Sequence, residues 1–219
     1  MPTLAFIHTS PVLVPLFNSL CQRHLAGVEV FHIADESLIK NTIKAGKLEP
    51  LTTRRLAGYI QSARDAGADA VLVTCSSIGN ATIASRPLFD FPVLRIDEAM
   101  AERAVDEGKI IGVLATLNTT LEPTQELVKT TAANRGKEVV VKARLCQGAF
   151  EAVLRGDTET HDRLVREGLL ELLAECDLIV LAQASMARVV DQLPAELRTK
   201  PILASPELAI LRAKAALGA

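Results

Sequence analysis

The sequence predicts an α/β fold made of two similar lobes, each with a mostly parallel sheet, related by a pseudo-twofold axis. Short apolar runs alternate with longer helical patterns along all 219 residues, which is typical of strands joined by helical crossovers. The strands and helices predicted in the first half are repeated in the same order in the second half. We expect a first lobe over 1–100 and a second over 101–219, with the C-terminal helix free to pack on the other lobe.

Two patterns of apolar residues predict the strands and helices of the first half. Each expected strand is a short apolar run, and each expected helix carries apolar residues three or four positions apart. In order, they are a strand at 3–9, a helix at 12–26, a strand at 28–34, helices at 36–45 and 51–66, and strands at 69–75 and 91–96. This alternation predicts parallel strand pairing.

The second half contains the same succession of elements. In order, they are a strand at 109–116, a helix at 119–135, a strand at 138–144, helices at 148–154 and 160–174, strands at 177–183 and 200–205, and a helix at 206–217. The segment GDTETHDRLV, residues 156–165, is expected to be a capped helix start with His161 facing solvent.

Landmarks of the two halves keep a nearly constant offset, which indicates a duplication. Equivalent residues lie 107 to 109 positions apart: Thr9 and Thr116, Asp69 and Asp177, Cys75 and Gln183, Pro92 and Pro201, Glu98 and Glu207. Ligands of open parallel sheets bind at the carboxyl ends of strands and between lobes. We therefore expect the active site in the interlobe cleft, formed by the residues that follow the strands.

Composition and charge exclude several classes of partner. Formal net charge is −2, aromatic residues are 3% and Trp is absent, so neither a phosphate backbone nor stacked bases are expected ligands. No apolar run approaches the ~18 residues of a membrane span, and the N-terminus has no basic leader. We expect a cytoplasmic protein with no nucleic-acid or membrane partner that binds a small molecule. A homodimer is the commonest symmetric assembly and is the oligomer expected.

Metal and phosphate motifs are missing from the sequence. It has no glycine-rich phosphate loop, and its four cysteines and four histidines do not have the spacing of a metal site. His8 and His32 are expected to approach each other on neighbouring strands as core histidines. Cys21, Cys146 and Cys176 are expected to be buried free thiols. Cys75 differs, because it ends a strand where a helix N-terminus would favour its thiolate and lower its pKa.

Small polar residues follow several of the strands, and they suit a bound carboxylate. Hydroxyls and backbone N–H groups at helix N-termini hold such groups. The candidate binding residues are Thr9, Ser10, Ser76, Ser77, Thr116, Asn118, Thr119, Gln183, Ala184 and Ser185, beside the candidate catalytic Cys75. Thr74, Thr120, Asp97 and Glu98 also lie at strand ends. The alternative is that Ser76 and Ser77 only start the element after Cys75, and that Thr119 or Thr120 only caps a helix.

Several motifs in their order resemble the aspartate/glutamate/hydantoin racemase superfamily, which includes maleate isomerase and arylmalonate decarboxylase. They are FIHTSP, ADAVLVTCSSIG, IGVLATLNTT, GAFEAVLRGDTETHDRLV and CDLIVLAQASM, and they span nearly the whole chain. The resemblance implies proton transfer at a substrate Cα between two facing cysteines, without cofactor or metal. By position, Cys75 matches the first cysteine, Ser76 and Ser77 replace the usual Asn and Thr, and Ser10 and Thr116 match carboxylate-binding positions.

The sequence departs from that pattern at Gln183, which stands in place of the second cysteine, and an amide does not exchange protons as an acid or base near neutral pH. One alternative is a one-base decarboxylase or isomerase using Cys75. Another is covalent addition of Cys75 in a cis–trans isomerase or hydrolase, and a third is a racemase with Glu98 or Asp35 as second base. The last is a binding protein without turnover, which predicts an ordinary Cys75 pKa where an enzyme predicts a depressed one.

Overall fold

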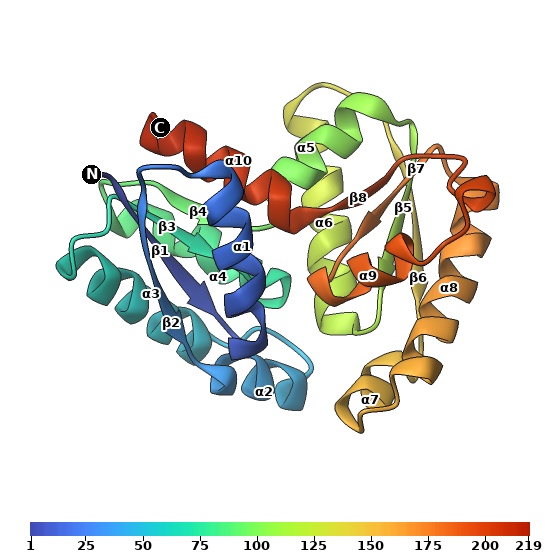
Figure 1. The fold of residues 1–219 in the computed structure, drawn as a ribbon, viewed down its shortest axis with the longest axis horizontal. Helices are drawn as coiled ribbons and strands as arrows, with labels where there is room; N and C mark the ends of the chain where they lie inside the picture. Colours follow the sequence, from blue (N-terminus) through green and yellow to red (C-terminus); the bar gives the residue numbers. More distant parts are fainter. The chain divides into compact units, whose positions relative to one another are not determined.

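A computed structural model describes residues 1–219 apart from the side chain of Ser185, and it contains two four-stranded parallel sheets with flanking helices (Figure 1). Contacts divide the chain into one unit of Met1–Glu98 with Pro206–Ala219 and another of Ala99–Ser205. The predicted α/β fold with two similar lobes is confirmed. The position of the active site in an interlobe cleft stays a prediction.

The sheet of the first unit has the order β2-β1-β3-β4, with all neighbours parallel. Its strands are β1 (Thr3–His8), β2 (Glu29–Ala34), β3 (Ala70–Val73) and β4 (Val93–Arg95). The two central strands are almost fully buried, which explains why they are continuous apolar runs. Ile7 pairs with Val73 at the carboxyl ends of β1 and β3, so the residues that follow these two strands are neighbours.

Helices cover both faces of this first sheet. They are α1 (Val14–His24), α2 (Glu36–Ala45), α3 (Pro50–Asp65), α4 (Gly79–Ser85) and α10 (Ser205–Leu217), with short 3-10 turns at Pro11–Leu13, Ser76–Ile78 and Arg86–Leu88. On one face Phe6 packs in a cluster with Phe17 of α1 and Ile210 of α10. On the other face Ile7 packs with Leu56 of α3. The C-terminal helix thus belongs by its contacts to the first unit.

The second unit repeats the arrangement with the order β6-β5-β7-β8, again parallel throughout. Its strands are β5 (Ile110–Ala115), β6 (Val140–Leu145), β7 (Leu178–Leu181) and β8 (Ile202–Ala204). Its helices are α5 (Glu98–Glu107), α6 (Asn118–Asn134), α7 (Ala149–Leu154), α8 (Thr158–Glu175) and α9 (Ala187–Asp191), with 3-10 turns at Ala184–Met186 and Ala195–Leu197. The shared strand order confirms that the chain repeats itself.

None of the helices within the described part of the chain combines the length and the apolar character needed to cross a bilayer.

Candidate functional site

Cys75 lies immediately after β3 and is partly buried. It is the N-cap of the 3-10 turn Ser76–Ile78, with extended backbone angles that turn the chain away from the sheet. The Thr9 hydroxyl, the Ser77 side chain and the backbone N–H groups of Ser77 and Ile78 lie around its sulfur and favour the thiolate, although the sulfur makes no cap hydrogen bond to the turn. These donors come from the ends of two adjacent strands, so the sheet itself determines where the sulfur stands.

The pKa of the Cys75 thiol is raised. Burial is the largest influence and disfavours the thiolate, while the hydrogen bonds from Thr9, Ser77 and Ile78 lower the pKa without compensating for it. The predicted depressed pKa is therefore wrong. The turn after Cys75 supplies only local N–H groups, and desolvation of the sulfur outweighs them. At neutral pH Cys75 rests as a thiol with donors already placed for a thiolate.

Gln183 occupies the equivalent place after β7, and its amide is held by Thr116. The Thr116 backbone N–H donates to Gln183 Oε1 at 2.7 Å, and Gln183 Nε2 is 2.8 Å from the Thr116 hydroxyl. The same threonine position contacts the strand-end residue in each unit, as Thr9 does with Cys75. The repeat therefore extends from the strand order to individual side-chain contacts.

The other predicted binding residues differ in exposure. Thr9, Ser76, Ser77 and Thr116 are buried, Ser10, Thr119, Gln183 and Ala184 are partly buried, and Asn118 is exposed. The side chain of Ser185 lies outside the described residues. Ser76 and Ser77 start the turn after Cys75, as expected.

The predicted capping of α6 by Thr119 or Thr120 is wrong. The N-cap is Leu117, which makes no side-chain cap, because α6 starts one residue earlier than predicted, at Asn118. Thr119 Oγ1 is instead a buried hydroxyl without a hydrogen-bond partner among the described residues. A buried hydroxyl of this kind costs free energy until it is paired.

Both candidates for a second base are bound to cationic side chains. Asp35 caps α2 by accepting from the Ser37 N–H, and its other oxygen accepts from Tyr59 and Arg55. Burial acts to raise its pKa, but these partners lower it overall. Glu98 forms a two-pronged ion pair with Arg86 at 2.8 and 2.5 Å. A role of either carboxylate as a second base stays a prediction, and each is held by an arginine.

The two strand histidines meet, as predicted. His8 Nε2 lies 2.8 Å from His32 Nδ1, and the chain continues from His32 Nε2 to Asn18 at 2.9 Å. At its other end His8 Nδ1 lies 2.8 Å from the Thr74 hydroxyl. Burial and the neighbouring His32 lower the pKa of His8 to about 4, so both the ring and its partners are neutral at pH 7.

His161 does not face solvent as predicted. Its side chain is 1% exposed, and Nδ1 lies 2.7 Å from Asp162 Oδ1, which Arg188 also contacts at 2.6 Å. Val165 and Leu169 lie one and two turns further along α8 and are buried in the core of the second unit. Because His161 shares their helix face, it is drawn inward with them.

The three remaining cysteines are buried free thiols, as predicted. Burial raises the pKa of Cys21 and of Cys146 to about 11. Cys176 belongs to the core of the second unit. Cys75 is therefore the thiol that is both accessible and surrounded by donors.

Sequence patterns do not predict the buried ion pair at the end of β4. Arg95, at the end of β4, makes two hydrogen bonds to Asp97 at 2.6 and 3.0 Å, and both side chains are about fully buried. Arg95 also donates to Asn80 of α4. Gly79 allows this, because a Cβ there would lie 2.3 Å from the Arg95 guanidinium carbon. The pair supports the turn and helix that follow Cys75.

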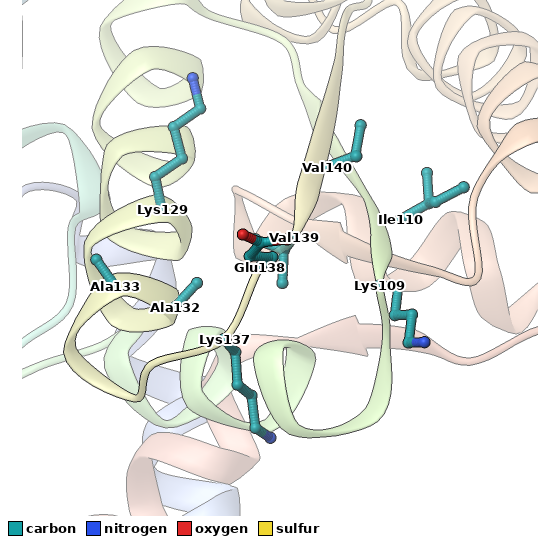
Figure 2. A pocket seen from close by; sticks show the side chains of 9 residues that line it. All are labelled: Lys109, Ile110, Lys129, Ala132, Ala133, Lys137, Glu138, Val139 and Val140. Carbon is teal, nitrogen blue, oxygen red and sulfur yellow. The ribbon is translucent and has the colours of Figure 1, made fainter.

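A pocket of about 600 Å³ lies elsewhere, at the starts of β5 and β6 (Figure 2). Lys109, Lys129 and Lys137 are among its lining residues. It stands at the amino-terminal edge of the second sheet, opposite the edge that carries Thr116 and Gln183. No group of three or more His, Cys, Asp or Glu side chains suited to a metal occurs in the described chain.

The sequence and the fold are both similar to known proteins. The sequence profile of the family described as Asp/Glu/hydantoin racemase matches residues 7–213. No curated protein sequence matches the chain significantly.

Several solved structures share the fold at low identity. Allantoin racemase from Klebsiella pneumoniae is 19% identical, with a TM-score of 0.70, over 100% of this chain and 89% of that one. Glutamate racemase from Bacillus anthracis is 16% identical, with a TM-score of 0.73, over 99% and 82%. Aspartate racemase from Picrophilus torridus is 15% identical, with a TM-score of 0.70, over 100% and 95%.

Proposed function

This chain belongs to the Asp/Glu/hydantoin racemase family, and from that premise we propose that it transfers a proton at the Cα of a small carboxylate, with Cys75 as the only sulfur acid or base. Family membership makes it an enzyme of the isomerase type. The observation that carries the finer proposal is the setting of Cys75, a partly buried strand-end thiol with the polar groups of Thr9, Ser77 and Ile78 around its sulfur. The proposed chemistry needs no cofactor, since the thiol itself carries the proton.

The raised pKa of Cys75 favours the thiol as the resting form, so the sulfur is loaded with the proton that it transfers. When a malonate substrate loses CO2, the electrons of the broken C–C bond leave an enediolate-like intermediate; the S–H bond then breaks, Cα gains the proton and the sulfur becomes a thiolate. The Thr9 hydroxyl and the N–H groups of Ser77 and Ile78 stabilise that thiolate. Water then returns a proton to the sulfur and closes the cycle. In exchange without decarboxylation, the thiolate form of Cys75 first removes the Cα proton, and the resulting thiol returns a proton to the same face.

The strand ends of the second unit support binding of the substrate carboxylate. Thr119 Oγ1 is buried without a partner, and it lies in the first turn of the 17-residue helix α6. Partial positive charge at a helix N-terminus favours an anion. We assign carboxylate contacts to Thr116, Asn118 and Thr119 in this unit, and to Ser10 and Ser76 in the first.

A one-base reaction on one face of Cα is favoured over two-base racemisation. Gln183 cannot exchange a proton, and its amide is bonded to Thr116. Asp35 and Glu98 are held by Arg55 and Arg86. Because a thiol at rest is best suited to protonating an enediolate, decarboxylation of a malonate substituted at C2 is the second candidate function.

The test is proton exchange in deuterium oxide. A panel of 2-substituted carboxylates and malonates is incubated with the wild-type protein, with Cys75→Ser and with Cys21→Ala. Cys21→Ala is the control, because it changes a buried thiol in the core of the first unit. NMR reports deuterium at Cα and loss of carboxylate, and chiral chromatography reports inversion. We expect deuterium incorporation on one face in the wild type and control, and none in Cys75→Ser.

Each alternative has its own result. Inversion by the wild type would overturn the argument from Gln183. Equal exchange by Cys75→Ser would overturn the role of Cys75. Binding of carboxylates without exchange or decarboxylation would identify a binding protein, and a mass increase of Cys75 with substrate would identify covalent addition.

A further inference from the structure

We infer that His8 and Thr74 are positioning residues for Cys75, joined in a clamp that holds the ends of β1 and β3 together beneath the sulfur. This inference rests on the proposed role of Cys75. Neither residue touches the sulfur. They act through the neighbouring pair Thr9 and Cys75, which follows each of them directly in the chain.

The clamp is the buried end of a continuous hydrogen-bonded chain whose far end, at His32 and Asn18, is partly buried. It runs from Thr74 Oγ1 to His8 Nδ1 at 2.8 Å, from His8 Nε2 to His32 Nδ1 at 2.8 Å, and from His32 Nε2 to Asn18 Oδ1 at 2.9 Å. Both imidazole rings stack with Phe6, with centroids 5.7 and 5.0 Å away. His8 is 0% exposed, so its ring is held on all sides.

The direction of the protons in this chain follows from its far end. Asn18 Oδ1 accepts, so His32 Nε2 carries a proton and His32 Nδ1 is an acceptor. In this arrangement His8 Nε2 donates to His32, and His8 Nδ1 accepts from the hydroxyl of Thr74, which lies closer to that nitrogen, at 2.8 Å, than to its other acceptor, the Ile7 carbonyl, at 3.2 Å. Every ring nitrogen is satisfied by one neutral arrangement, which orients the Thr74 side chain.

The clamp and the reactive pair stand on opposite faces of the sheet. Side chains alternate along a strand, so His8 and Thr74 share the face of Phe6, and Thr9 and Cys75 share the face of Ile7. Ile7 is the last residue of β1 that pairs with β3, where it lies beside Val73. The His8–Thr74 bond therefore adds to the backbone bond from Thr74 N–H to the Ile7 carbonyl, and it joins the two strands directly before Thr9 and Cys75.

The second half of the chain shows that the fold does not require this polar chain. At the offsets that relate Thr9 to Thr116 and Cys75 to Gln183, the counterparts of His8 and Thr74 are Ala115 and Ala182. His32 pairs with Phe6 in β1, and the corresponding residue paired with Val113 in β5 is Ala143. The three polar residues next to Cys75 in the first unit are thus replaced by three alanines next to Gln183 in the second.

Buried polar side chains cost desolvation free energy that alanine does not. The same strand order, with the same threonine at the strand end, forms in the second unit without them. What differs between the two units is the residue that the threonine contacts. The polar chain therefore occurs in the unit that has Cys75 at the strand end, and the strand order common to both units forms without it.

The test measures the reactivity of Cys75 without any substrate. Iodoacetamide alkylation is followed between pH 7 and 10 by mass spectrometry of the peptide 65–95, which contains no other cysteine. The proteins are the wild type, Thr9→Val, Thr74→Ala, the double variant and Thr74→Ser. Thr124→Ala is the matched control, a fully buried threonine of α6 whose hydroxyl bonds at 2.8 Å to a backbone carbonyl.

Thr9→Val removes a donor to the thiolate and should slow alkylation at pH 8 by about tenfold. In the Thr74→Ala background the same substitution should change the rate less than twofold, since the clamp no longer holds Thr9 on the sulfur. Thr74→Ser keeps a hydroxyl and should restore the wild-type rate and the full effect of Thr9→Val. Thr124→Ala should leave both unchanged.

An equal effect of Thr9→Val in the wild-type and Thr74→Ala backgrounds would overturn the inference, as would a wild-type rate in Thr74→Ala. Circular dichroism checks that each variant is folded. If Thr74→Ala is not folded, Thr74→Ser still tests the role of the Thr74 hydroxyl. Because alkylation involves no substrate, failure here is distinguishable from failure of the proposed function, which shows as missing Cα exchange.

Discussion

Acid should destabilise this protein well above the pH at which carboxylates are protonated, because His8 is buried as a neutral ring. Its pKa in the folded protein is about 4, against an ordinary value of 6.5. Below pH 6.5 the unfolded chain binds a proton that the folded chain does not. The stability that depends on neutral His8 is therefore fully present above pH 6.5 and is lost as the pH falls toward 4.

The size of the loss follows from the two pKa values. The difference corresponds to about 2 kcal/mol of unfolding free energy by pH 5 and about 3 kcal/mol by pH 4. His32, the ionisable neighbour 2.8 Å away, also has a lowered pKa and adds to the loss in the same direction. Asp35 has a pKa lowered from 3.8, so its contribution is lost at lower pH, outside this range.

Urea unfolding followed by circular dichroism between pH 7.5 and 4.5 measures this slope. His8→Gln removes the titrating group, so its unfolding free energy should fall about 2 kcal/mol less across the range than that of the wild type. Ile210→Val is the control, because it removes one methylene from the same buried cluster and should cost about 1 kcal/mol at every pH. Identical slopes for the wild type and His8→Gln would refute the reasoning.

Three further outcomes are expected. Gly79→Ala places a methyl group against the Arg95 guanidinium and should lower the free energy of unfolding in urea by about 3 kcal/mol. Gly58→Ala, at a helix position with open space, should raise it by up to about 1 kcal/mol. Equal effects of the two substitutions would contradict the close packing of Gly79 on Arg95. Gln183→Cys should add inversion at Cα to one-sided exchange, as seen by chiral chromatography, and unchanged stereochemistry would count against equivalence of the two positions. Decarboxylation that ends in protonation by the Cys75 thiol should stay constant from pH 7 to 9 and fall only above the ordinary thiol pKa of 9.0, which burial raises further; a fall below pH 8 would contradict a thiol acid.

Strands and repeat could be predicted because their signals are local. Runs such as 69–75 and 177–183 are continuous and apolar, and they became β3 and β7 with the same neighbours. Helix α5 escaped prediction, since its buried positions include the small residues Ala101 and Ala104, which give a weak periodic pattern. The predicted homodimer stays a prediction.

Side-chain environments could be predicted less well, because they depend on residues distant in the sequence. The polar neighbours of His161 suggested exposure, yet Val165 four residues on was the better signal. The helix N-terminus predicted an acidic Cys75, and burial of the sulfur reversed the direction. Pairing of Thr9 with Cys75 follows from strand register, which neither residue type nor spacing reveals.

The duplicated architecture offers a way to separate residues that the fold needs from residues that the chemistry needs. Threonine stands at the end of the first strand in both units, and in both it contacts the residue after the third strand. A role common to both, such as strand-end geometry or carboxylate binding, explains that retention. Cys75 and His8 correspond to Gln183 and Ala115 in the second unit, so their loss should affect proton transfer more than folding.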